Sequence, residues 1–319
     1  MKHFTKIIAA VSALTASAAV ADDQQDYDDT VTVLTFIDRL FNQGDATAVD
    51  EMVSPDYVQH NAAVEGGLDA LKALTPVRND NGNLPTRKVV LRVAADDRMV
   101  AVHSIVTDND ANDDADVPNI TFVDIFRVGD DQMIVEHWDV IQLEVAFLPA
   151  AADGSIRLGN PTQWGPEPET KTPQEWAAAG QATEDYIDDD YLPRLYAYYL
   201  FNEPSEADYT DFFTQDMVQH AAYIAPGLEG LQVFKDNLHP EFAAKVRRWA
   251  IQGDLAIVHL QWTETLAERG SDFCGWNVAD VLRFNEAGKV VEHWSVKART
   301  ACFSVNGNTP FDGVSGFTE

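Results

Sequence analysis

The chain has 319 residues, enough for about two domains of ordinary size, and its hydrophobic fraction of 45% is that of a globular protein. The 52 acidic residues outnumber the 22 Lys and Arg residues and give a formal net charge of -30. A surface this acidic repels nucleic acids and anionic membranes, so the composition argues against both as partners.

The first residues have the pattern of an export signal. Two lysines precede an apolar stretch over residues 7–20, which is too short to span a bilayer. The small residues Ala19 and Ala21 fit a cleavage site, so residues 1–21 are expected to be a signal peptide. The expected location of the mature protein is therefore periplasmic or extracellular.

Helices are predicted first in the chain that follows. Residues 32–42 carry apolar side chains at helical spacing, and short helices are predicted over 47–52 and 68–74. Stretches rich in Val, Ile and Phe come next, and the predicted strands are 88–93, 99–106, 120–128 and 133–141. Helices followed by a mostly antiparallel meander predict an α+β domain, in which the helices cover one face of a curved sheet.

The same order of motifs occurs twice. The tetrapeptide Tyr-Val-Gln-His at 57–60 returns as Met-Val-Gln-His at 217–220, 160 positions later. Val-Glu-His-Trp at 135–138 returns identically at 291–294, 156 positions later. Many ordered matches at these two shifts indicate a tandem duplication with a four-residue difference in one loop.

The duplication divides the chain into parts. The expected parts are copy one (28–143), a connector (144–187), copy two (188–299) and a C-terminal tail (300–319). The connector is rich in Pro, Gly and Ala, and Trp164 and Trp176 are expected to pack on a domain. The Gly-rich tail is expected to be loose.

The two cysteines, Cys274 and Cys302, both lie in or after copy two. An exported protein meets an oxidising compartment, so a disulfide is one interpretation and two buried thiols are the other. Neither cysteine has a counterpart in copy one, which argues against a catalytic thiol.

Polar residues kept in both copies are the candidates for chemistry. They are the histidine pairs His60 and His220, His103 and His259, and His137 and His293, together with Asp124 and Asp280. Asp124 alternates with Phe122 and Phe126 on an otherwise apolar strand face. Burial there would raise the pKa of Asp124 and make it a general base, whereas the alternative role is a structural salt bridge.

The histidines are expected to assist that carboxylate. A neutral imidazole at His103 would orient Asp124 or polarise a carbonyl oxygen, and His60 would lie at a pocket mouth. For each histidine a structural hydrogen bond is the alternative. No metal-binding motif, phosphate loop or nucleophile elbow is present, so neither a metal nor another cofactor is predicted.

These motifs together resemble the SnoaL-like polyketide cyclase family of the nuclear transport factor 2-like superfamily. The resemblance rests on Phe-Asn-x-Gly at 41–44, Tyr-Val-Gln-His-Asn at 57–61, Asp-x-Phe-Arg at 124–127 and Val-Glu-His-Trp-Asp-Val at 135–140. It covers residues 31–142 well and residues 191–298 more weakly, because Ala221 replaces Asn61 and Ser295 replaces Asp139.

The resemblance implies a cone-shaped domain with an internal pocket and a cofactor-free aldol-type cyclisation with a strand aspartate as base. By this resemblance Asp124 and Asp280 take that role, with His103 and His259 as partners. Isomerase and lyase chemistry also fit. The expected ligand is a small apolar or carbonyl-containing molecule, and the candidate contact residues are Tyr57, Asn61, Phe122, Trp138 and Trp294.

Two other functions stay open. The cones could bind an apolar small molecule without chemistry, or the two copies could form an intramolecular pseudo-dimer that interacts with a partner. Trp138 and Trp294 suit a core or an interface better than a ligand contact.

Overall fold

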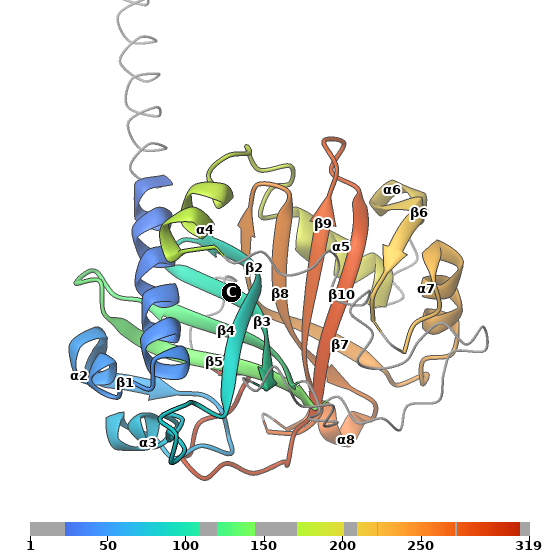
Figure 1. The fold of residues 1–319 in the computed structure, drawn as a ribbon. Coiled ribbons are helices and arrows are strands. Elements are labelled where there is room, and N and C mark those ends of the chain that lie inside the picture. The colour runs from blue at the N-terminus through green and yellow to red at the C-terminus, as the bar shows by residue number, and fades with distance from the viewer. Residues whose placement is uncertain are drawn as a thin grey trace, which may run out of the picture.

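The computed structural model shows two α+β units, each with a five-stranded sheet preceded by helices (Figure 1). The described residues are 23–108, 120–143, 171–200, 209–221, 223–271 and 273–312. The predicted signal peptide and Trp164 lie outside them. Among the described helices, none combines the length and the apolar character needed to cross a membrane.

Copy one begins with a helix over residues 23–37 that continues as the π-helical turn η1. Its buried side chains Val33, Leu34, Ile37 and Leu40 recur at three- and four-residue spacing, so one stripe of the helix faces the sheet. The elements of copy one are η1 (Asp38–Asn42), α2 (Thr47–Met52), β1 (Val53–Gln59), α3 (Leu68–Ala73), β2 (Thr86–Asp96), β3 (Met99–Asp108), β4 (Ile120–Val128) and β5 (Ile134–Leu143).

Copy two repeats this order after helix α4 (Pro173–Gly180) of the connector, whose Trp176 packs against the core of copy one. The elements of copy two are α5 (Tyr191–Leu200), α6 (Tyr209–Phe212), β6 (Phe213–Gln219), α7 (Gly227–Asp236), β7 (Ala243–Gln252), β8 (Leu255–Thr263), α8 (Leu266–Arg269), β9 (Trp276–Phe284) and β10 (Val290–Arg299). The predicted α+β class with two tandem domains is confirmed.

Each sheet has one strand that the sequence pattern did not predict. The strand orders are β1-β5-β4-β3-β2 and β6-β10-β9-β8-β7, and β1 and β6 run parallel to their neighbours. Strand β1 carries Pro55 and exposed polar residues, so it lacks the alternation that marks a strand. Because β1 lies at the edge of the sheet, it tolerates Pro55, which has no N–H to donate to a neighbouring strand.

The two faces of each sheet are buried against different partners. One face packs on the helices of its own copy and forms that copy's core, called here the interior face. The other face packs on the opposite sheet through one shared apolar cluster, which includes Ile125, Trp138, Ile257 and Trp294. This second face is called the interface.

Two arginines cross the interface in a reciprocal manner. The Arg92 guanidinium of copy one lies 3.6 Å from the ring centre of Trp294, and the Arg248 guanidinium of copy two lies 4.1 Å from that of Trp138. Desolvated cation–π contacts of this kind are worth about 2 kcal/mol. The duplicated motif therefore supplies a matched pair of contacts between the copies.

Residues 300–312, called here the C-terminal segment, are not the loose tail that the glycines suggested, and residues 313–319 of the predicted tail lie outside the described residues. The C-terminal segment crosses from copy two to the β1 side of copy one, where the Val305 N–H donates to the Ala62 carbonyl (3.0 Å) (Figure 1). Phe311 is buried, and the Asp312 carbonyl accepts from Trp138 Nε1 (2.9 Å). The prediction was wrong because side-chain and backbone hydrogen bonds hold a segment whose composition alone indicates a loop.

Cys274 and Cys302 form a disulfide that links the start of β9 to the beginning of this segment. The closed loop of 28 residues would contribute roughly 3–4 kcal/mol in the chain-entropy model. The bond thus anchors the C-terminal segment at its origin.

A carboxyl between the copies makes stability pH-dependent. Burial, followed by the charge of Asp189, raises the pKa of Asp96 to about 7, although its Oδ2 accepts from the Ile251 N–H at 3.4 Å. Because the folded pKa exceeds the unfolded one, this group costs stability as pH rises from about 4 to about 7.

We expect Asp96→Asn to raise the free energy of unfolding by roughly 1–3 kcal/mol above pH 7 and to have little effect near pH 4. Urea unfolding across this pH range measures the difference from wild type. The exposed Asp80→Asn serves as control. A gain that is the same at both ends of the range would contradict the assignment.

Candidate functional site

The predicted catalytic residues divide between the two faces of each sheet. In β4, Asp124 points to the interior face, opposite Val102 of β3 and Asp139 of β5. His103 pairs with Val123 and therefore points to the interface, where its Nδ1 lies 3.2 Å from Arg92. The expected pairing of Asp124 with His103 is wrong, because adjacent positions across the ladder alternate between faces.

The imidazole that reaches Asp124 belongs to His137. His137 Nε2 lies 3.2 Å from Asp124 Oδ1, and Lys88 Nζ lies 2.5 Å from Asp124 Oδ2. Both carboxylate oxygens thus face cations or donors in a site with little solvent exposure. Sequence reasoning missed Lys88, which copy two replaces by Ala244, so the comparison of copies did not flag it.

Lys88 is held at its backbone by the side chain of Asn42 and at its ammonium by two aromatic rings. The Asn42 side chain of η1 accepts from the Lys88 N–H (2.7 Å) and donates to the Lys88 carbonyl (3.0 Å). The ammonium lies 4.3 Å from the ring centre of Phe122 and 4.9 Å from that of Phe41. Phe122, expected to contact a ligand, therefore packs on this lysine.

The expected rise in the pKa of Asp124 does not occur. Burial alone would raise that pKa, but the Lys88 ammonium and the hydrogen bond from His137 outweigh it and hold the pKa below its usual value. The ion pair with Lys88 is the structural salt bridge that the sequence left open as the alternative role of Asp124. Asp124 is consequently an ionised anchor for two donors.

His137 has a polar partner at each ring nitrogen. Gln59 Oε1 accepts from the Asn61 N–H (2.9 Å) and lies 3.2 Å from His137 Nδ1, while Gln59 Nε2 donates to the Tyr57 hydroxyl (3.1 Å). The oxygen of Gln59 thus faces Nδ1, and the carboxylate of Asp124 faces Nε2.

A second carboxylate, Asp139, completes the cluster. Burial, reinforced by the charge of Asp124, raises the pKa of Asp139, and Asn61 Nδ2 donates to its Oδ2 at 2.9 Å. Unlike Asp124, Asp139 keeps part of its surface exposed. Asp139 shares a face of β5 with His137, as the strand alternation predicts, but no role was predicted for it.

Tyr57 lies beside these carboxylates. Burial and then the charges of Asp139 and Asp124 raise its pKa well above 10, so its hydroxyl stays protonated. The hydroxyl accepts from Gln59 and keeps its own proton, so it can also act as a donor. Tyr57 and Asn61, both predicted contact residues, are thus close to the polar cluster.

Copy two has the same dyad in a different setting. His293 Nε2 lies 3.2 Å from Asp280 Oδ1, and the Tyr196 hydroxyl donates to Asp280 Oδ2 (2.9 Å). Met217 replaces Tyr57, so Gln219 Nε2 finds no hydroxyl there and donates to His293 Nδ1 (3.0 Å). His293 Nδ1 thus faces an amide N–H, whereas His137 Nδ1 faces an amide oxygen.

The remaining predicted residues lie at the interface or under the C-terminal segment. His60 stacks on Trp138 at 4.5 Å and its Nδ1 lies 2.8 Å from Asp312 Oδ1, so it is buried rather than at a pocket mouth. His220 stacks likewise on Trp294 at 4.5 Å. His259 bonds Arg248 and Asn277 at the interface. Trp138 and Trp294 are interface residues, not pocket walls.

Two cavities open on the interior side of the copies. In copy one a cavity of about 340 Å³ lies between the first helix, β2 and α4, with Lys88, Asn42 and Trp176 among its walls. In copy two a cavity of about 450 Å³ lies at the end of the sheet, with Lys297 among its walls. Asp124 and Asp280 line neither of these two.

The donor atoms of Asp124, His137 and Asp139 lie within 4.8 Å of one another, close enough to share a metal ion. The Lys88 ammonium, however, already contacts Asp124 at 2.5 Å, where a metal would have to compete with it. This donor set therefore suits a proton and a lysine better than a divalent cation.

The model of the SnoaL-like domain family matches residues 33–137 and 194–293, which together make up more than half of the chain. The chain therefore belongs to this family, and both copies carry its domain. A comparison with curated proteins finds no significant match.

Several solved structures are similar to single copies. A protein from Jannaschia sp. CCS1 described as a SnoaL-like polyketide cyclase is 20% identical (37% of this chain, 87% of that chain, TM-score 0.28). A steroid delta-isomerase from Pseudomonas aeruginosa is 15% identical (36% and 80%, TM-score 0.26). An NTF2-like protein of unknown function from Mesorhizobium loti is 16% identical (37% and 93%, TM-score 0.29).

Removing the buried counter-ion of Asp124 tests the site. We expect Lys88→Met to lower the free energy of unfolding by about 3–5 kcal/mol at pH 7, because it leaves a buried carboxylate unpaired. The loss should shrink as pH falls and Asp124 takes up a proton. Urea titrations at neutral and acidic pH measure both effects.

The double variant Lys88→Met/Asp124→Asn should recover much of this loss. Lys72→Met removes the exposed partner of Asp50 (2.6 Å) and should change stability little. Equal losses for Lys88→Met and Lys72→Met would mean that the Lys88 pair is not a buried ion pair.

Proposed function

We propose that copy one binds a small carbonyl-containing molecule and moves a proton on it without a cofactor, as a cyclase, isomerase or lyase does. The proposal is carried by Asp139, a carboxylate with a raised pKa beside the buried Asp124 and His137 pair. A base with a raised pKa transfers protons more effectively near neutral pH.

In this proposal the groups have separate roles. Asp139 removes a proton from the carbon next to the carbonyl, and the Tyr57 hydroxyl donates to the oxygen that becomes an enolate. Asn61 orients Asp139, and the Lys88 and Asp124 ion pair lies behind it with His137. Tyr57 is a suitable donor because its raised pKa keeps the proton on it.

Copy two supports a second candidate function, binding without proton transfer. It has Ser295 in place of Asp139, Met217 in place of Tyr57 and Ala221 in place of Asn61, so it lacks all three groups of the proposed mechanism. It nevertheless keeps a cavity of about 450 Å³, a size that suits a small molecule. We propose that copy two binds a ligand and does not transform it.

We further propose that the copies act as an intramolecular pseudo-dimer and that the protein is exported. The shared apolar cluster and the reciprocal Arg92 and Arg248 contacts support the first proposal. The pattern of residues 1–21 supports the second.

Proton transfer can be tested without knowing the product. Cyclic ketones that raise the melting temperature are incubated with the protein in D₂O, and exchange of the protons next to the carbonyl is followed by NMR. We expect wild type to catalyse exchange, and Asp139→Asn to lower the rate by about 10²–10⁴-fold while ketone binding persists.

Ser295→Ala is the matched control at the equivalent position of copy two and should leave exchange unchanged. Tyr57→Phe should slow exchange and keep the fold, because the ring still packs. If bound ketones exchange equally fast with wild type and Asp139→Asn, copy one does not use this base.

Export has a direct readout. Expression with the complete N-terminus should yield a mature protein that begins at Asp22, as measured by intact mass spectrometry of the secreted or periplasmic fraction. A chain that keeps Met1 and stays in the cytoplasm would contradict export.

A further inference from the structure

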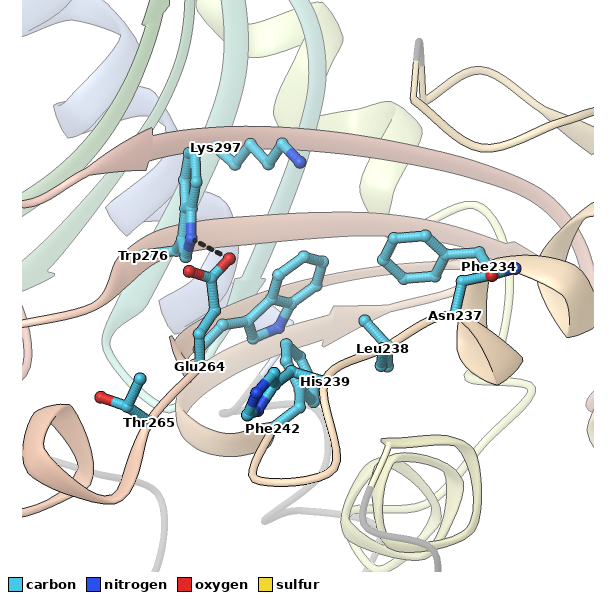
Figure 2. A pocket seen from close by; sticks show the side chains of 10 residues that line it. Phe234, Asn237, Leu238, His239, Phe242, Glu264, Thr265, Trp276 and Lys297 are labelled. Atoms are coloured by element: carbon cyan, nitrogen blue, oxygen red, sulfur yellow. Dashed lines mark hydrogen bonds between the residues drawn. The ribbon is translucent and has the colours of Figure 1, made fainter.

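Copy two has a cavity with aromatic walls and a lysine at positions where copy one has aliphatic residues. Its lining residues are Phe234, Asn237, Leu238, His239, Phe242, Trp262, Glu264, Thr265, Trp276 and Lys297. Figure 2 shows Lys297 and Trp276 on the sheet side, and Phe234, Leu238 and Phe242 opposite them, from the end of α7 and the segment after it. The cavity thus has aromatic walls on both sides.

Lys297 brings a positive charge into this aromatic space. It lies two residues beyond Ser295 on β10, on the same interior face, and pairs with Val278. Its ammonium lies 3.3 Å from the ring centre of Tyr223 and 5.1 Å from that of Trp276. Within the described residues the ammonium contacts aromatic rings and forms no hydrogen bond or ion pair, although the charges of Glu264 and Asp280 act on it through space.

The carboxylate that lines this cavity has partners other than Lys297. Glu264 Oε1 accepts from Trp276 Nε1 (3.1 Å), and Glu264 Oε2 forms an ion pair with Arg299 (3.2 Å), which also pairs with Glu268 (Figure 2). Asp280, deeper in the same copy, is bonded by Tyr196 and His293. Lys297 is therefore the cation among the lining residues, and its ammonium is free to pair with a ligand.

We propose that this cavity binds a small organic anion with a flat apolar ring system, whose carboxylate or similar group pairs with Lys297. The rings of Trp262, Trp276 and Phe242 would contact the flat part, and the ammonium would contact the anion. A cationic ligand is disfavoured, because Lys297 already occupies the rings that would hold it.

The specificity belongs to copy two alone. The positions of Lys297, Trp262 and Trp276 correspond to Ile141, Val106 and Ile120 in copy one, and Tyr223 corresponds to Ala63. The inference rests on the proposed function only in the premise that a copy of this domain binds a small molecule. It requires no proton transfer.

The net charge of -30 opposes the approach of an anion over long distances. Salt screens this repulsion beyond about 8–10 Å, whereas the contact between Lys297 and a bound carboxylate is short and partly desolvated. Modest salt should therefore speed the association of an anionic ligand and weaken the bound state little.

The test uses 2-naphthoate and its neutral analogue 2-naphthamide, titrated into the full-length protein by calorimetry with tryptophan fluorescence as a second signal. We expect 2-naphthoate to bind more tightly than 2-naphthamide. Lys297→Met should weaken 2-naphthoate binding roughly 10- to 100-fold, as for the loss of a charged hydrogen bond, and leave 2-naphthamide unchanged.

Lys297→Arg keeps the charge and should keep the preference for the anion, and Lys245→Met removes an exposed lysine of β7 and should match wild type. Burial lowers the pKa of Lys297 to about 8, so 2-naphthoate binding should weaken from about pH 7.5 to about pH 9.5 in wild type and not in Lys297→Arg. The other charged and titratable groups that face Lys297 are Glu264, Asp280, His239, Arg299 and Tyr223. Burial holds the pKa of Tyr223 well above 10, and the Lys297→Arg variant keeps all of these groups and so controls for them.

Equal affinity of wild type for the two probes, or an unchanged preference in Lys297→Met, would overturn the proposal. The Asp139→Asn variant separates it from the proposed function. One outcome is that ketone exchange is absent while 2-naphthoate still binds more weakly to Lys297→Met than to a protein with Lys297, also when both carry Asp139→Asn. That result supports the copy-two site and rejects the proposed proton transfer. If exchange occurs and the anion preference is absent, the copy-two site is wrong.

Discussion

The alternation of side chains along a β-strand is the constraint on which this protein depends. Each sheet is covered on both faces, so neighbouring residues of one strand enter different environments. Asp124 faces its own helices, whereas Val123 beside it faces the other copy. A shift of one residue in register would exchange the polar cluster for the interface, so the pairing of β3, β4 and β5 determines both.

This separation explains why both copies keep the same histidines. His103 and His259 bond the arginines that cross the interface, and His60 and His220 stack on the tryptophans that those arginines cover. Each Trp is thus held between an imidazole of its own copy and a guanidinium of the other. Only His137 and His293 belong to the interior clusters. Duplication preserved the interface histidines because the contact is reciprocal, so a change in one copy damages a contact with the other.

The interior faces were free to diverge. In copy one Tyr57 orients the Gln59 amide so that its oxygen faces His137, and Lys88 forms an ion pair with Asp124. In copy two Met217 and Ala244 stand at the Tyr57 and Lys88 positions, and Tyr196 bonds the aspartate instead. The same aspartate–histidine contact of 3.2 Å therefore lies beside an ammonium in one copy and beside a phenol hydroxyl in the other.

Sequence comparison between the copies located the duplicated domains, most strands and every residue of the interior dyads, because these features repeat. The comparison could not assign each histidine to the interior face or to the interface. Alternation along a strand gives the face of a residue only when the face of a neighbouring residue is known. The comparison also overlooked Lys88, Asp139 and Lys297, because each occurs in one copy alone. In this tandem protein most of the polar residues that both copies share form the contact between the copies. The residues that give each copy a different chemistry do not repeat. The unmatched polar residues on the interior strands, rather than the conserved motif, are therefore where a difference in function between the copies has to arise.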